Sequence, residues 1–193
     1  IRLLEGGGGS VAPPPRGQSA APDPGPEAAA PRFMSIMRAM GQVPVVSAAL
    51  GSVAGMPAAR LVASHLALMT RDTSQVLVGG PALVERALRV TLSKQELGGP
   101  EVHLKSGVVD NLAADEREAL QIVRRFLSYL PTNSGERAPV TACDDPPGRR
   151  EEELLSIVPR ERRRAYKMRR ILELVLDRGS LFELAPSYGR TQI

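Results

Sequence analysis

The residues of this 193-residue chain that could do chemistry are mostly glycines. The stretch GSVAGMPAARLVASH, residues 51–65, places two glycines and a patch of small side chains directly before a predicted helix. Such a bare backbone suits a tight turn, close packing of two backbones, or the approach of a ligand to backbone N–H groups. Backbone N–H groups at a strand-to-helix turn can stabilise an enolate or another oxyanion without an acidic or basic side chain. Packing remains the alternative to such a site.

Side chains offer little conventional catalytic chemistry. The chain has two histidines, His65 and His103, and no HxxxH, CxxC, GxSxG or P-loop pattern. We interpret both histidines as structural hydrogen-bonding residues. The single cysteine, Cys143, lies beside Asp144 and Asp145, whose negative charges disfavour a thiolate nucleophile. One cysteine allows no internal disulfide or Cys-based metal cluster and favours a reducing compartment. We therefore predict no metal site.

Composition limits the class of protein. Aliphatic residues must build the core, because aromatic residues make up 3% of the chain and there is no tryptophan. The net charge of +4 and the scarcity of aromatic residues do not predict a nucleic-acid-binding protein. No run of 18 apolar residues predicts a membrane span.

A basic run, RERRRAYKMRR at residues 160–170, carries seven cationic side chains. A solvated helix face explains it most simply. The functional alternative is a phosphate-contacting patch for an anionic ligand or an acidic partner.

The N-terminal third divides by composition. Residues 1–10 join a short apolar run to a glycine tract. Residues 11–31 hold seven prolines and no aromatic residue, so this Pro/Ala-rich insert is predicted to be disordered. Residues 33–40 have helical spacing and end at Gly41.

The elements that must position the glycines alternate between strands and helices. A continuous apolar run at 43–50 predicts a strand buried on both faces, followed by the bare turn and a short helix through His65. Strands at 66–70 and 75–79 follow, and Pro81 opens a helix. This alternation predicts an α/β layer fold.

The second half is predicted to be mostly helical. Ser93 and Glu96 form a capping box, and Gly98-Gly99 ends that short helix. A clear amphipathic helix spans about 115–130, a polar loop covers 132–150, and a last helix is predicted at about 162–177. The residues of this last helix that we expect to face inward are Ala165, Met168, Ile171, Leu172 and Val175.

Several ordered motifs together resemble one family. They are GPALVERAL, SKQELGG, the H…SGV pattern, FLSYLP, LLSIVP, AYKMRRILELVLDRGSLFEL and PSYG, with RLLEGGGGSV and the 51–78 region upstream. Their order is similar to that in the carboxyltransferase (β) subunits of biotin-dependent acyl-CoA carboxylases, of the propionyl-CoA and acetyl-CoA type. The likeness covers everything except the Pro/Ala-rich insert. One departure is that Ala54-Gly55-Met56-Pro57 stands where the family often has Ala-Gly-Gly-Ala.

The resemblance implies an α/β, crotonase (ClpP)-like fold of repeated ββα units, here partial. It implies transfer of CO2 from carboxybiotin, held on a partner carrier protein, to the α-carbon of a short acyl-CoA. Backbone N–H pairs would hold the oxyanions. The residues expected at the reacting atoms are Gly6, Gly7, Gly8, Gly9, Ala54 and Gly55. The residues expected to bind the substrate are Gly51, Ser52, Val53, Ala58, Gly79 and Gly80.

The resemblance also sets expectations about organisation. Residues 1–10 would end a core strand, and residues 32–193 would form an incomplete N-terminal carboxyltransferase domain without the second domain. We therefore expect this chain to be inactive by itself. Expected partners are a biotin carboxylase or biotin carrier subunit and further β subunits in a homo-oligomer. The expected compartment is the bacterial cytoplasm, with the mitochondrial matrix as the alternative.

Three other functions stay open at this stage. An enoyl-CoA hydratase or isomerase of the same fold would need a carboxylate aimed at the substrate, and Glu5 is the acidic residue beside the bare turns. A non-catalytic carboxylase assembly subunit would fit a shortened chain. A basic nucleic-acid binder fits poorly because no aromatic residues interleave with the cations.

Overall fold

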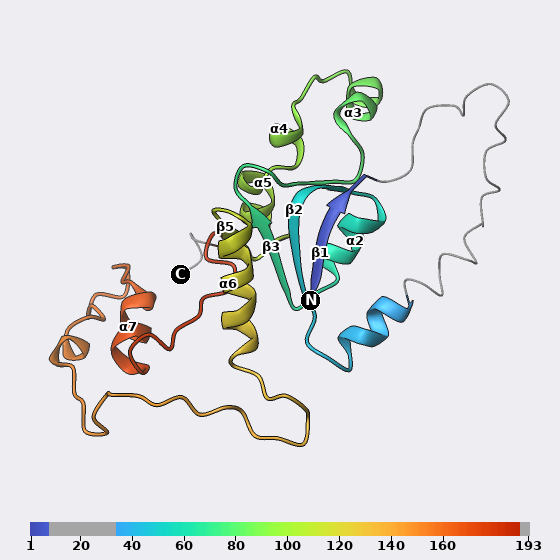
Figure 1. Ribbon diagram of the computed structural model, residues 1–193. Helices are drawn as coiled ribbons and strands as arrows, with labels where there is room; N and C mark the ends of the chain where they lie inside the picture. The colour runs from blue at the N-terminus through green and yellow to red at the C-terminus, as the bar shows by residue number, and fades with distance from the viewer. Residues whose placement is uncertain (8–33, 190–193) are drawn as a thin grey trace, which may run out of the picture. The chain divides into compact units, whose positions relative to one another are not determined.

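The structure is a computed structural model that describes residues 1–7 and 34–189 (Figure 1). The predicted disordered insert at 11–31, Gly8 and Gly9 lie outside the described residues. The chain forms two compact units. Of the described residues, unit 1 contains those of Ile1–Val123 with Ala185–Tyr188, and unit 2 contains Arg124–Leu184 with Gly189.

Unit 1 is built on a parallel sheet. Its strands are β1 (Arg2–Gly6), β2 (Val46–Ala54), β3 (Leu66–Thr70), β4 (Gln75–Leu77) and β5 (Asn111–Ala113). The strand order is β1-β2-β3-β5, and β4 pairs with β2 beyond the end of β3. All four strand pairs are parallel.

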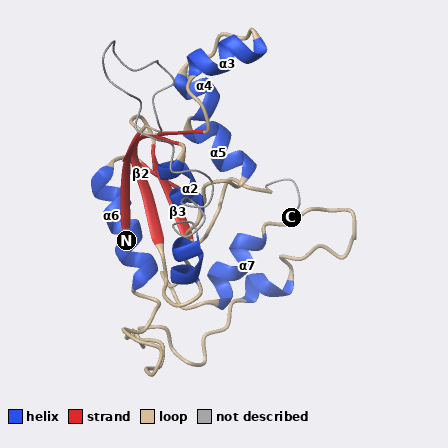
Figure 2. Cartoon of the chain, turned by 90° about the vertical axis from the view of Figure 1, so that its right-hand side faces the viewer, coloured by secondary structure: helices blue, strands red, loops and turns tan. Residues whose placement is uncertain are grey.

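Helices cover both faces of this sheet, as Figure 2 shows for α2 and α6. The helices are α2 (Met56–Val62), α3 (Pro81–Leu88), α4 (Lys94–Gly98), α5 (Pro100–Ser106) and α6 (Glu116–Leu127), and residues 34–40 are also helical. The core lies between the sheet and α2 with α5. Its buried residues are Ala49, Val53, Ala58, Leu61, Ala67, Met69, Val76, Leu104 and Val109. The predicted α/β layer fold is therefore confirmed.

The position of β2 corrects one prediction. The predicted strand at 43–50 extends instead from Val46 to Ala54, so the expected turn at 51–55 is reduced to Gly55. The extension has a physical cause, because two further strands continue the hydrogen-bonded ladder on either side of it. Val53 pairs with Gly6 of β1 and with Val76 of β4. Small side chains here therefore mark a strand packed between neighbours, not a long turn.

Several local predictions are confirmed. β3 has the predicted bounds, Pro81 begins α3, and α6 lies within the predicted 115–130 range. Both hydrogen bonds of the Ser93–Glu96 capping box are present. The short elements α5 and β5 were not predicted.

Unit 2 is mostly loop, as predicted for residues 132–150, with a 3-10 helix η1 (Glu152–Leu155) and α7 (Met168–Val175). The predicted helix at 162–177 is therefore wrong in its first six and its last two residues. Its predicted inward face is also wrong, because Leu174 is the buried residue of α7 while Val175 is 61% exposed. A short helix in a loop-rich unit has no broad apolar surface to cover its whole stripe, so periodicity alone misplaces the buried face.

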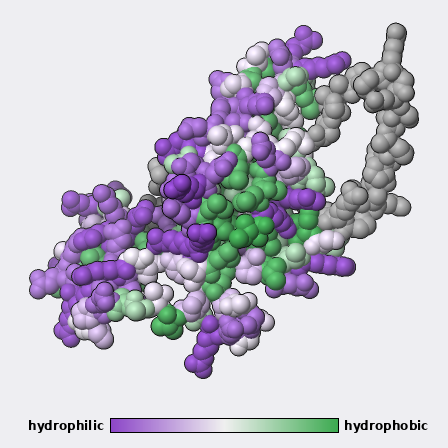
Figure 3. All heavy atoms as spheres, in the orientation of Figure 1, coloured by the Kyte–Doolittle hydropathy of each residue, from purple (hydrophilic) through white to green (hydrophobic). Residues whose placement is uncertain are grey.

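In the part of the chain that the structure describes, no helix has the length and apolar character needed to cross a bilayer. Hydrophobic side chains nevertheless gather on the surface over the middle of unit 1 (Figure 3). The exposed apolar residues of unit 1 include Leu3, Val78, Leu83, Leu88 and Val90.

Candidate active site at the strand ends

Three strands of unit 1 end at the same edge of the sheet. Gly6, the last residue of β1, pairs with Val53, and Leu77, the last residue of β4, pairs with Ala54 at the end of β2. Because all three strands are parallel, their carboxyl ends meet there, which is where open α/β sheets bind ligands. The structure thus brings the predicted residues Gly6, Ala54 and Gly55 to one edge, while Gly7 follows β1 and Gly79 and Gly80 follow β4 by two and three residues.

Gly55 makes the sharp turn from β2 into α2. Its φ of 64° and ψ of −125° belong to a region that favours glycine. Its N–H donates to the carbonyl oxygen of Leu77 at 3.3 Å, and its own carbonyl oxygen accepts from the N–H of Ala59 at 3.0 Å. The Gly55 N–H is therefore engaged in the sheet, whereas the expected role required it to face a ligand.

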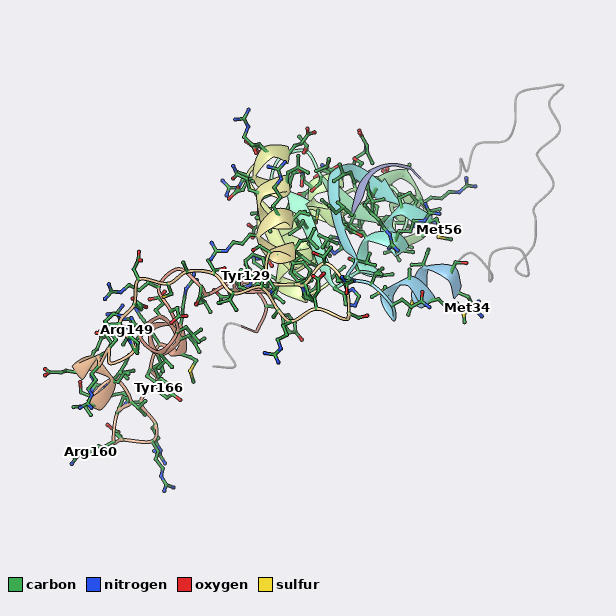
Figure 4. All side chains as sticks on the ribbon, turned by 60° about the horizontal axis from the view of Figure 1, so that its bottom comes forward. Met34, Met56, Tyr129, Arg149, Arg160 and Tyr166 are labelled. Carbon is green, nitrogen blue, oxygen red and sulfur yellow. The ribbon has the colours of Figure 1, made fainter. Side chains whose placement is uncertain are left out.

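The next residue offers the N–H that Gly55 does not. Met56 is the first residue of α2, and its N–H has no hydrogen-bond acceptor among residues 1–7 and 34–189. Pro57 has no N–H to donate. Met56 is 39% exposed and lies at the end of the sheet (Figure 4). The donor at this turn is therefore the backbone of Met56, which the residue pattern did not single out.

Other glycines at this edge leave their backbone open. A Cβ on Gly6, Gly7 or Gly80 would meet no described atom within 4 Å. Gly6 also has a φ of 124°, which glycine adopts without strain. Gly79 differs, because a Cβ there would lie 2.7 Å from Cδ2 of Leu83 in α3. Backbone approach is thus open at Gly6, Gly7 and Gly80.

The remaining predicted substrate-binding residues contribute to packing. Val53 and Ala58 are buried in the core, with 0% and 8% exposure. The Ser52 hydroxyl donates to Oε1 of Gln75. A Cβ on Gly51 would lie 2.8 Å from Oε1 of Glu5, so the Glu5 side chain lies directly over Gly51. Glu5 is the residue directly before Gly6 in β1.

Both histidines bond to backbone groups, as predicted. Nδ1 of His65 accepts from the N–H of Val45 at 3.0 Å. Nε2 of His103 lies 2.8 Å from the carbonyl oxygen of Val76, which requires the Nε2–H tautomer as donor. His103 therefore holds β4 near its end and takes no part in the open edge.

Gly98 is a residue whose role the pattern did not reveal. A Cβ there would lie 2.1 Å from the carbonyl oxygen of Val76 and 2.6 Å from Cδ2 of Leu77. The backbone of α4 can approach β4 so closely only because residue 98 has no side chain. The signal in the sequence was the Gly98-Gly99 pair, which predicted the end of the helix and not the contact.

Charged side chains of unit 2 form ion pairs with one another. Arg170 binds Glu153 through Nη2 and Oε2 at 2.6 Å, and this hydrogen bond lowers the pKa of Glu153 and raises that of Arg170. Cys143, Asp145 and Asp177 also lie within metal-ligand distance of one another, but the Asp145 carboxylate is paired with Arg149 and Arg178.

Comparison with known proteins identifies the family of this chain. The model of the carboxyl transferase domain family matches residues 27–193. The human mitochondrial propionyl-CoA carboxylase beta chain is 34% identical over 162 residues, which are 83% of this chain and 30% of that protein. The propionyl-CoA carboxylase carboxyltransferase subunit of Haloferax mediterranei is 35% identical over 159 residues, 82% of this chain and 31% of that protein.

Solved structures agree with this likeness. Transcarboxylase 12S, solved as a hexamer with hydrolysed methylmalonyl-CoA bound, has a TM-score of 0.75 and 26% identity, covering 81% of this chain and 30% of that one. A single-chain, multi-domain long-chain acyl-CoA carboxylase has a TM-score of 0.69 and 30% identity, covering 95% of this chain and 16% of that one.

The fold and site define an α/β protein with the crotonase-like fold of carboxyltransferases. The chain belongs to the carboxyl transferase domain family. It spans about 30% of the length of the curated relatives that it matches.

Proposed function

We propose that this chain forms the acyl-CoA-binding part of a biotin-dependent carboxyltransferase, acting on a short acyl-CoA such as propionyl-CoA. Membership of the carboxyl transferase domain family supports the class of reaction. The observation that carries the proposal is the open backbone at the ends of β1, β2 and β4, with the unused N–H of Met56 among it.

The chemistry follows from where charge develops. Removing the α-proton of an acyl-CoA moves negative charge onto the thioester oxygen, and a fixed N–H directed at that oxygen stabilises it. In this chain, the N–H of Met56 serves as that donor, and Gly55 orients it by turning the backbone at a φ of 64°. Carboxybiotin on a partner would supply the carboxyl group and a ureido nitrogen that accepts the α-proton. No acidic or basic side chain of this chain is then required.

The partners that this function requires are a biotin-bearing carrier or biotin carboxylase subunit and further copies of the β subunit. Exposed apolar side chains in unit 1, such as Val78 at 100% and Leu88 at 69% exposure, support packing against other chains. The bacterial cytoplasm or the mitochondrial matrix is the proposed compartment. The human relative is described as mitochondrial, and another relative comes from Haloferax mediterranei.

A spectroscopic experiment tests the proposed donor without turnover. Propionyl-CoA labelled with 13C at the thioester carbonyl is titrated into the chain, and the infrared carbonyl stretch of the bound ligand is measured. Met56→Pro removes one N–H while keeping the helix, since proline is favoured at the first helical position. Met56→Leu is the matched control that retains the N–H.

We expect the stretch to move to lower frequency in the wild type and in Met56→Leu, and to stay near its solution value in Met56→Pro. In turnover by the carboxylase, losing one such donor should cost about 10²–10³ in rate. An equal shift in Met56→Pro would refute the role of Met56. Failure of propionyl-CoA to bind at all would instead favour a non-catalytic assembly subunit.

A second candidate function, enoyl-CoA hydration, rests on the Glu5 carboxylate beside Gly51. A hydratase needs such a group to activate water. Hydration of crotonyl-CoA that disappears in Glu5→Gln would support this function over carboxyl transfer.

A further inference from the structure

The loop that joins η1 to α7 carries an excess of positive charge equal to the net charge of the whole chain. Residues 160–167 contain five of the 25 Lys and Arg residues and one of the 21 Asp and Glu residues, so the rest of the chain carries 20 of each sign. All residues from 161 to 170 are exposed. Figure 3 shows a largely hydrophilic surface where this part of unit 2 lies. The excess charge is therefore concentrated on one short exposed segment.

The cations of the basic run divide into paired and unpaired ones. Arg169 pairs with Glu173 and Glu183, and Arg170 pairs with Glu153. The other five have no ion-pair partner among the described residues, and they are Arg160, Arg162, Arg163, Arg164 and Lys167. A solvated helix face does not describe them, since residues 160–167 precede α7 and are not helical.

Two of these unpaired cations line a concave site. A pocket of about 410 Å³ lies between η1 and the start of α7, and Arg164 and Lys167 line it together with Tyr166, Ser156 and the Arg170–Glu153 pair. Its volume is within the range of small-molecule sites. Arg160 does not line it and lies at the periphery of unit 2, away from Tyr166 (Figure 4).

The start of α7 adds to the positive potential of this pocket. Lys167 is the N-cap residue, no side chain caps the helix, and its first turn contains no acidic residue. Cations at the positive end of a helix dipole are unfavourable unless an anion lies there. Of the three cations that line the pocket, Arg170 is offset by Glu153, so Arg164 and Lys167 are the two without an ion-pair partner among the described residues.

We propose that this pocket binds a ligand with two neighbouring phosphoryl groups, contacted by Arg164 and Lys167 at the start of α7. A guanidinium fork and an ammonium group suit phosphoryl oxygens, and the N–H groups at a helix start donate hydrogen bonds to the same anions. The proposal stands apart from the thioester site, since every residue that it uses lies in unit 2. Failure of either proposal would therefore leave the other intact.

Inorganic pyrophosphate is the probe, titrated calorimetrically into the whole chain at low and moderate salt. The test variant is Arg164→Gln/Lys167→Gln, and the matched control is Arg160→Gln/Arg163→Gln. Both remove two positive charges from the same exposed loop, but only the first changes the pocket. Far-ultraviolet circular dichroism checks that both variants fold.

We expect saturable binding by the wild type and the control within twofold of each other, and at least tenfold weaker binding by the pocket variant. Equal losses of affinity in both variants would show diffuse electrostatic attraction between the loop and pyrophosphate, and would overturn the proposed pocket. Such attraction also weakens as salt is added, because the Debye length is about 10 Å at 0.1 M salt. Absence of saturable binding by the wild type would also overturn it. Displacement of pyrophosphate by CoA would identify the cofactor as the source of the phosphoryl groups, and binding alongside CoA would indicate a separate ligand. Either of these two results supports the pocket.

Discussion

Replacing Gly98 by Ala tests how closely α4 packs against β4. In an ordinary helix, replacing glycine by alanine stabilises the helix by up to about 1 kcal/mol, because alanine has the higher helix propensity. Here the added Cβ would lie 2.1 Å from the carbonyl oxygen of Val76, a backbone atom that cannot turn away. An ordinary contact begins at 3.4 Å, so the two segments must separate by about 1.3 Å.

That separation affects a second interaction. The Val76 carbonyl oxygen is also the acceptor for His103 Nε2 at 2.8 Å, and α5, which carries His103, follows α4 directly. Overpacking costs about 1–3 kcal/mol, and weakening this hydrogen bond adds about 1 kcal/mol. The steric cost exceeds the helix-propensity gain. We therefore expect Gly98→Ala to lower the free energy of unfolding by about 2 kcal/mol.

Urea unfolding of the whole chain, followed by circular dichroism, measures this change. Gly41→Ala is the matched control, because its Cβ would meet one atom, the Arg38 carbonyl oxygen, at an ordinary 3.6 Å. We expect that variant to stay within about 0.5 kcal/mol of the wild type. A Gly98→Ala protein as stable as the control would refute the close backbone packing.

Two further predictions concern named side chains. His103→Leu leaves the Val76 carbonyl oxygen without its donor and should lower the free energy of unfolding in urea by about 1–2 kcal/mol. His65→Gln, at an exposed position, should lower it by less than about 0.5 kcal/mol. Similar losses in both variants would contradict the difference in role. Arg170 holds the pKa of Glu153 below its ordinary value of 4.5, so this carboxylate stabilises the folded chain above about pH 4.5 and loses that effect as pH falls through its lowered pKa. The difference in unfolding temperature between the wild type and Glu153→Gln should therefore shrink at acid pH, and a difference that does not change with pH would argue against the ion pair.

Local features of the fold could be predicted from the residues because their causes are local. Proline at position 81 begins α3, and Ser93 with Glu96 caps α4, since each needs only neighbours within one helical turn. The glycine-rich stretches at Gly6 and Gly55 both lie at the carboxyl ends of strands, those of β1 and β2. The family resemblance from ordered motifs was confirmed by the comparisons.

Tertiary structure decided what those local signals meant. Gly51, Ser52 and Val53 looked like a bare turn, but pairing with β1 on one side and β4 on the other makes them strand residues. The same pairing engages the N–H of Gly55 with Leu77, whereas the N–H of Met56 stays open. The spacing of apolar residues cannot predict hydrogen bonds between distant segments, because it indicates only which face of its own helix or strand a residue occupies.

Helix α7 also shows that residue spacing alone does not predict tertiary contacts. The apolar spacing of residues 162–177 indicated an inward face, yet Leu174 is buried and Val175 is exposed. Amphipathic spacing predicts that a helix has an apolar side, whereas the surfaces that surround it decide which part of that side is covered. For this chain, the sequence by itself determined the family, the glycine-rich positions, and the starts of α3 and α4. Only the folded structure decided which backbone N–H is free and which cations share a pocket, because both depend on contacts between distant segments.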